Sequence, residues 1–251
     1  MRKLKNYLLL TAFTVFSLGA SAQSPVPTKN NIFKINLTSL AFKNLSFQYE
    51  RVLTPKSSFA IGASFMPKTG LPFADALKEQ YGDNPDAKRA IETTQLSNYT
   101  ITPEYRFYLS GKAPNGFYIA PFARYQHMYF EQLYEFTASN GNLHKPLIGG
   151  NIDNIGGGVL FGAQWTLGKS LTFDWWIAGP VVGTSSGLLT GYDDMSDMDA
   201  QDRADLKNDI ESTELPLLNV DANVGNNQVD VKLSGGYAGL RAMGFTFGFR
   251  F

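Results

Sequence analysis

Hydrophobic and polar residues alternate along much of this chain, and the clearest case is its final stretch. Phenylalanine takes every second position from Phe245 to Phe251, and polar or small residues lie between. Successive side chains of a β-strand point to opposite faces, so this period predicts a strand with one apolar and one polar face. The same alternation predicts eight strands, at residues 32–40, 45–53, 58–66, 98–109, 116–130, 154–167, 171–180 and 236–251.

The connections between these segments alternate in length. Those after the second, fourth and sixth segments are short, whereas residues 67–97, 131–153 and 181–235 form long connections. Short turns at one end and long loops at the other are typical of outer-membrane barrels. We therefore predict an all-β fold, a closed antiparallel eight-stranded transmembrane β-barrel with long extracellular loops. Residues 73–94 and 193–214 are expected to carry short helices, and residues 228–236 leave open whether the last hairpin is extended or a ninth and tenth strand are added.

Seven charged residues within the predicted strands fall on the polar face. A charge that faces lipid at mid-bilayer costs roughly 2–4 kcal/mol, so this face is expected to line the lumen. Four cations and three carboxylates share it, and we expect them to form a structural charge network, with Arg106 or Arg124 bound to Glu104 or Asp174. The predicted network comprises Lys34, Glu50, Glu104, Arg106, Arg124, Asp174 and Arg250.

Aromatic residues on the apolar face gather near the short turns. Amphipathic rings prefer the interface between a membrane and water, so these positions predict an aromatic girdle. Its main members are expected to be Tyr49, Phe107, Trp165, Trp175 and Phe251. A soluble barrel of lipocalin type that binds a small hydrophobe is the alternative, and it would place the aromatic rings inside and the charges outside.

The N-terminus has the three-part pattern of a secretory signal peptide. Arg2, Lys3 and Lys5 precede an apolar run, and a small-residue segment ends at Ala22. We expect residues 1–22 to be a signal peptide and residues 23–251 to form the outer-membrane barrel domain.

Composition removes several other classes of protein. The 22 basic and 22 acidic residues of the 251-residue chain balance, which argues against a nucleic-acid partner. The chain has no cysteine, so it has neither disulfides nor thiolate chemistry.

Candidate catalytic residues are few, since the chain has only His127 and His144 as histidines. His127 is expected at the outer end of its strand, where a lipid A modifying enzyme would place a histidine. Position 129 is Tyr129, however, so a His-x-Ser pair is missing. The acidic segment 193–214 lacks the glycine of a calcium loop. We expect no catalysis, no cofactor and no metal, and keep an enzyme that uses His127 as an alternative.

Three stretches resemble a known family: "ITPEYRFYLSGKAPNGFYIAPFARY" (101–125), "GGVLFGAQWTLGKSLTFDWWIAGP" (157–180) and the final "GFRF". They are similar to a small outer-membrane β-barrel family of Bacteroidetes that is catalogued only as a domain of unknown function. The resemblance implies an outer-membrane location and a barrel, and it supplies no activity. The expected partners are outer-membrane lipid and lipopolysaccharide, and the barrel assembly machinery through the strand that ends at Phe251. The expected role is structural or surface interaction through the outer loops, whose ligand the sequence does not name.

Overall fold

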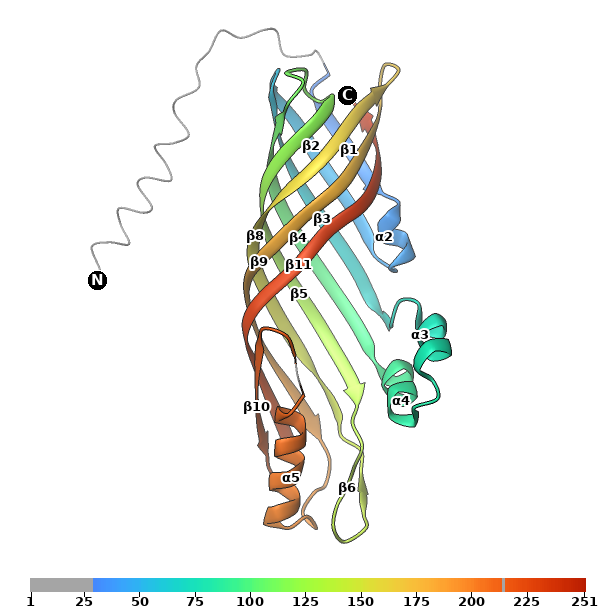
Figure 1. The fold of residues 1–251 in the computed structure, drawn as a ribbon, viewed down its shortest axis with the longest axis vertical. Helices are drawn as coiled ribbons and strands as arrows, with labels where there is room; N and C mark the ends of the chain where they lie inside the picture. The colour runs from blue at the N-terminus through green and yellow to red at the C-terminus, as the bar shows by residue number, and fades with distance from the viewer. Residues whose placement is uncertain (1–28, 214) are drawn as a thin grey trace, which may run out of the picture.

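The computed structural model describes residues 29–213 and 215–251, so the predicted signal peptide at residues 1–22 lies outside the described residues. Eight antiparallel strands form a ring of hydrogen-bonded neighbours in the order β1-β2-β3-β4-β5-β8-β9-β11, and β11 pairs back with β1 (Figure 1). The ring strands are β1 (Asn31–Asn36), β2 (Leu45–Thr54), β3 (Ser57–Gly70), β4 (Gln95–Tyr108), β5 (Gly116–Leu133), β8 (Leu147–Leu167), β9 (Leu171–Tyr192) and β11 (Gln228–Arg250).

The two ends of the ring differ. Short turns join β2 to β3, β4 to β5 and β8 to β9 at the end where the chain finishes, which we call the short-turn end. The opposite end, called the loop end, carries α3 (Ala74–Tyr81), α4 (Pro85–Thr93), β6 (Phe136–Thr137), β7 (Leu143–His144), α5 (Ala200–Glu211) and β10 (Leu218–Val224). The one-turn helix α2 (Thr38–Ala41) joins β1 to β2 and lies partway along the ring, in contact with β11 (Figure 1).

The strands are strongly tilted. A line of paired residues that starts at Ile35 and passes once around the ring reaches Gly236 on β11, whereas Ile35 itself pairs with Phe247. A displacement of this kind is what closing a twisted sheet on itself requires.

The ring closes over only part of its length. β1 pairs with β11 from Ile32 to Asn36, where the Asn36 side chain accepts a hydrogen bond from the Ser39 amide and the chain turns into α2. β10 pairs with the loop end of β11 as far as Gly235. Within the described residues, the stretch 237–244 of β11 therefore has a partner strand, β9, on one edge only, because Gly236 and Phe245 still form main-chain hydrogen bonds with Leu217 and Leu37 on the other. We call this stretch the seam gap.

The structure corrects the predicted boundaries of several strands. The first predicted strand, 32–40, ends at Asn36 because α2 begins two residues later. Three strands, β8, β9 and β11, continue far into the predicted loops and reach 21, 22 and 23 residues, whereas β5 passes its predicted end by three residues and reaches 18. The stretch 228–236 belongs to β11, and β10 lies beside it outside the ring of eight. The short helices expected in 73–94 and 193–214 are α3, α4 and α5. Among the residues that the structure describes, none of the helices has the length and apolar character needed to cross a membrane.

Candidate functional site

Six charged side chains meet inside the ring in its short-turn half, and we call them the interior charge cluster. They come from five strands and are almost fully buried, at 0–7% exposure. Lys34 Nζ lies 2.5 Å from a Glu50 oxygen and 2.8 Å from an Asp174 oxygen. The complete cluster comprises Lys34, Glu50, Glu104, Arg106, Asp174 and Arg241.

Arg106 is the centre of this cluster. Its guanidinium lies 2.5 Å from Glu104, 2.7 Å from Asp174 and 3.3 Å from Glu50. The guanidinium carbon also lies 4.4 Å from the centre of the Tyr118 ring. Arg241 adds a further ion pair with Glu104. Three cations thus balance three carboxylates, which is the condition under which burying charge is least costly.

Neutral polar side chains complete the hydrogen bonding of the cluster. Gln48 accepts from Arg106 at 2.8 Å and donates to Glu104 at 3.1 Å. The hydroxyls of Tyr108 and Tyr118 donate to Glu50 and Asp174, at 2.6 and 2.8 Å. An eight-stranded ring is just wide enough for side chains to fill it, so these contacts obstruct the interior at this level.

Two of the seven residues predicted for the charge network do not join the cluster. Arg250 lies at the rim, where its Nε donates to the main-chain oxygen of Lys29 at 2.6 Å. Arg124 faces the interior on the loop-end side of the cluster, and no described carboxylate lies in ion-pair range of it, contrary to the predicted pairing with Glu104 or Asp174.

Arg241 is the cluster residue that the sequence reasoning missed. β9 carries an extra residue at Ile177, where its register with β8 shifts, and Met243 takes a left-handed conformation with φ 55° on the adjoining part of β11. Beyond these bulges the opposite set of residues points inward. Arg241 therefore turns inside, and its guanidinium carbon lies 3.9 Å from the centre of the buried Trp176 ring.

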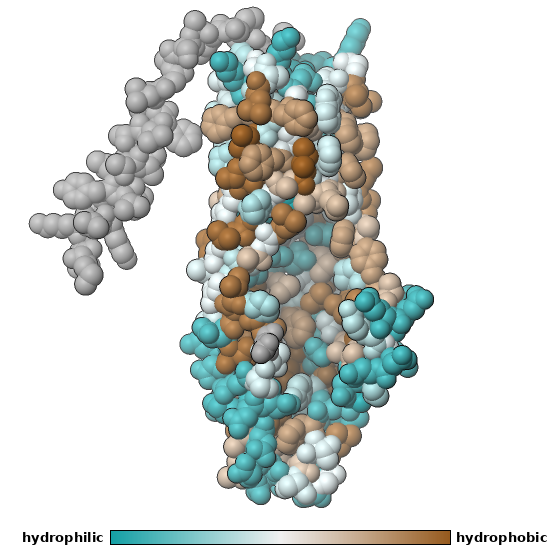
Figure 2. Space-filling model, in the orientation of Figure 1, coloured by the Kyte–Doolittle hydropathy of each residue, from teal (hydrophilic) through white to brown (hydrophobic). Residues whose placement is uncertain are grey.

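The aromatic residues predicted for the girdle lie on the outer surface. Their exposed fractions run from 37% for Tyr49 and Trp175 to 51% for Phe107 and Phe251, with Trp165 at 39%. Trp165 stacks on Phe173 with ring centres 5.9 Å apart, and Trp175 stacks on Phe245 at 6.3 Å. Figure 2 shows apolar side chains covering the outside of the short-turn half, and polar ones around the helices of the loop end.

The two faces exchange polarity partway along the strands. On β11, Phe245 and Phe247 are exposed, whereas Val229, Val231 and Leu233 near the loop end are buried and the intervening Lys232 is exposed. β8 behaves in the same way, since Phe161 and Trp165 are exposed while Ile148 and Ile152 are buried. The short-turn half is thus apolar outside and ionic inside. The loop end is apolar inside, and its outer surface mixes polar residues with exposed Leu147, Leu188 and Tyr192.

His127 lies on the outer face where this change occurs. Its Nδ1 is 2.8 Å from an Asp153 oxygen that also accepts from the Tyr125 hydroxyl at 2.6 Å. The ring stacks on Tyr99 with centres 5.0 Å apart. These contacts hold the imidazole between the side chains of neighbouring strands.

The acidic segment folds as a cap over the loop end. Asp199 caps α5 in a capping box with Asp202, and Asp202 also accepts from the amide and the hydroxyl of Ser139. Hydrogen bonds from Asn142 and Asn140 lower the pKa of Asp197. In the part of the chain that the structure describes, no set of three or more His, Asp or Glu side chains is arranged to hold a metal ion. The acids that the sequence presents as a possible cation site therefore serve helix capping and loop packing.

Comparison with known proteins places the chain in a family. A family model described as "Protein of unknown function (DUF3575)" matches residues 7–183. The match covers most of the chain, and the protein belongs to this family. No curated protein and no solved structure matches the chain.

Proposed function

We propose that the protein is an integral outer-membrane β-barrel that holds a rigid interaction platform outside the cell. The exchange of polarity between the two faces is the observation that carries this proposal. A soluble sheet keeps its apolar face inward along its whole length, as the loop end does. Where the apolar residues of a strand face outward over half of its length, they need an apolar environment outside the protein. For a closed ring of strands, that environment is lipid.

The interior charge cluster supports the same placement. The soluble, lipocalin-like alternative needs an apolar interior and charged residues outside, and the short-turn half has the reverse arrangement. On this proposal the aromatic girdle contacts outer-membrane lipid and lipopolysaccharide, the predicted leader 1–22 directs export, and the strand ending at Phe251 is the one presented to the barrel assembly machinery. The role is interaction rather than catalysis, because His127 is held by Asp153 and Tyr99 in a cross-strand contact and position 129 is a tyrosine.

Orientation is testable because the chain has no cysteine. A single cysteine at Asn208→Cys on α5 is expected to react with a membrane-impermeant maleimide on intact cells, because this exposed position lies at the loop end. The matched variant Lys169→Cys, in the exposed turn between β8 and β9, is expected to react only after the outer membrane is opened. The measurement is the labelled fraction of each variant by gel shift, and equal labelling of both on intact cells would contradict the proposal.

The protein is expected to conduct no ions. The interior charge cluster and its tyrosine and glutamine neighbours obstruct the lumen. An eight-stranded ring leaves no room for an ion path beside them at the level of the cluster. Planar-bilayer recordings check this, with an open porin as the positive control. Reproducible single-channel steps from the purified protein would show that the cluster is not a seal.

A further inference from the structure

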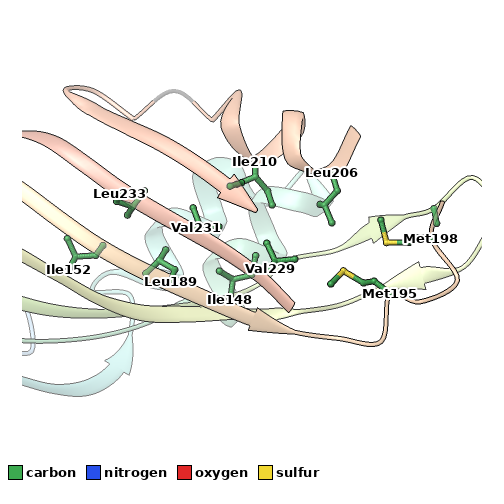
Figure 3. Close-up of a cluster of buried hydrophobic side chains, with 12 residues drawn as sticks. Ile148, Ile152, Leu189, Met195, Met198, Leu206, Ile210, Val229, Val231 and Leu233 are labelled. Atoms are coloured by element: carbon green, nitrogen blue, oxygen red, sulfur yellow. The ribbon is translucent and has the colours of Figure 1, made fainter. Parts of the chain in front are cut away.

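An apolar cavity of about 470 Å³ lies inside the loop end. Its walls come from four ring strands together with α5 and β10, and Figure 3 shows part of this lining pointing toward a common centre. The side chains that define it best are Met128, Phe130, Ile152, Leu189, Val231 and Leu233.

The size of this cavity sets it apart from ordinary packing defects. Protein interiors hold few voids larger than a water molecule, and cavities that bind small molecules are typically about 300–1,000 Å³. Its lining is almost entirely aliphatic, aromatic or methionine, so water gains few hydrogen bonds there. An apolar molecule is the occupant that this chemistry favours.

Polar groups without partners lie directly below the cavity. The inward row of β5 runs from Arg124 through Gln126 to Met128, so the arginine stands four residues, or about 13 Å, below the cavity wall. Arg124 Nε is buried without a hydrogen-bond partner, and so are Asn98 Oδ1 and Thr100 Oγ1 on the adjacent β4. Buried polar atoms in proteins nearly always have a hydrogen-bond partner, so this row of unpartnered atoms favours a polar group of a ligand.

The charge at this place is uncompensated. The interior charge cluster balances three cations with three carboxylates, whereas Arg124 has no carboxylate within ion-pair range among the described residues. The partly buried guanidinium has a side-chain hydrogen bond with the neutral Tyr237 hydroxyl, and its Nε has no partner. An anionic group placed there would balance the charge and form a charge-assisted hydrogen bond.

We infer that the loop end binds an amphipathic molecule with an apolar body and a single acidic group, of the long-chain carboxylate class. The apolar body occupies the cavity and the acid lies against Arg124. The seam gap at 237–244 adjoins the polar row below the cavity, since the Tyr237 hydroxyl lies 3.4 Å from the Gln126 side-chain oxygen. This inference rests on the proposed function, because the proposed orientation of the barrel determines from which side of the membrane the ligand arrives.

Photoaffinity labelling tests the inference. The probe is dodecanoic acid that carries a diazirine at the end of its chain, applied to the folded protein in lipid nanodiscs, and the labelled peptides are mapped by mass spectrometry. We expect labelling of the peptides that contain Met128 and Ile152, and we expect excess unlabelled dodecanoic acid to suppress it. Labelling of outward residues that contact lipid is expected not to saturate.

Two pairs of measurements distinguish the contribution of the apolar cavity to ligand binding from that of Arg124 below it. Leu233→Trp fills the cavity and is expected to abolish saturable labelling, whereas its outward neighbour Lys232→Trp is expected to leave it unchanged. Arg124→Gln is expected to weaken competition by dodecanoic acid about tenfold or more, the value of one hydrogen bond to a charged group, and to leave competition by dodecanol unchanged.

Folding of every variant is checked by its heat-modifiable gel mobility. Unsaturable labelling in a protein that still inserts and shows that mobility would overturn the inference and leave the proposed function standing. Equal competition by the acid and the alcohol in the unaltered protein would overturn the assignment of the acidic group to Arg124. A protein that remains monomeric and folded without detergent or lipid would contradict the proposed function instead.

Discussion

Replacement of Arg106 by methionine is expected to lower the free energy of unfolding by about 3–5 kcal/mol, the cost of removing one partner from a buried ion pair. Arg106 contacts Glu50, Glu104 and Asp174, and without it the interior holds three carboxylates against Lys34 and Arg241. Methionine preserves much of the side-chain volume, so the loss reports charge rather than a cavity. Urea titration in lipid vesicles, followed by tryptophan fluorescence, measures it.

Two variants show whether charge balance is the cause. Arg250→Met removes a guanidinium that donates to a main-chain oxygen at the rim, and a change within about 0.5 kcal/mol is expected. The double variant Arg106→Met with Asp174→Asn restores equal numbers of cations and carboxylates, and it is expected to recover part of the lost stability. A double variant less stable than the single one by the full cost of Asp174→Asn would show that the cluster is not governed by its net charge.

Replacement of Ile61 by arginine is expected to destabilise the membrane-inserted protein by roughly 2–4 kcal/mol. Ile61 is exposed on the apolar face of β3, between exposed Phe59 and Phe65, so the new guanidinium would meet hydrocarbon. In a water-soluble ring the same exposed position would accept arginine at almost no cost. The yield of the heat-modifiable form and its urea midpoint in vesicles are the measurements.

Tyr192→Arg is the matched control for this substitution. Tyr192 is more exposed than Ile61, at 71% against 41%, but it lies at the loop end of β9, outside the apolar belt. A change within about 0.5 kcal/mol is expected there. Equal effects at the two positions would remove the distinction between the lipid-facing and water-facing parts of the surface.

Period-2 alternation was sufficient to predict the ring strands and their pairing. Phe245, Phe247 and Phe249 are all exposed, and Thr246 and Gly248 between them are buried, as the alternation requires. The pairing of each strand with its sequence neighbour follows from short turns at one end, and the closure of β1 with β11 follows from an even strand number. Five of the seven predicted network residues meet because their inward positions lie at the same level of the ring, whereas Arg250 lies at the rim and Arg124 on the loop-end side.

Arg241, the cluster residue that was missed, lies beyond an interruption of that period. Arg241 turns inward only because of the interruption at Met243, and a change of this kind is not visible in a single sequence. The neighbouring Gly244 and Gly179 are the only local hints, since glycine in a strand often marks a bulge.

The extended halves of β8 and β11 were assigned to loops for a different reason. Their alternation is regular, but Val229, Val231 and Leu233 are apolar on the inward face rather than the outward one. A pattern with the apolar residues on the outward face therefore ends where, on the proposed placement, the surroundings change from lipid to water. The strand itself continues past that point. The cavity lined by these residues follows from the three-dimensional closure of the strands and has no signature in the sequence.

The length of β9 and β11 determines how far the platform projects. About ten residues suffice for a tilted strand to cross a bilayer, whereas these strands have 22 and 23. On the proposed placement, the remaining dozen residues raise α5 by roughly 25 Å above the hydrocarbon. On that placement, a stalk of this height carries α5 through the crowded layer of lipid-attached sugars, so that molecules too bulky to approach the bilayer itself can contact it.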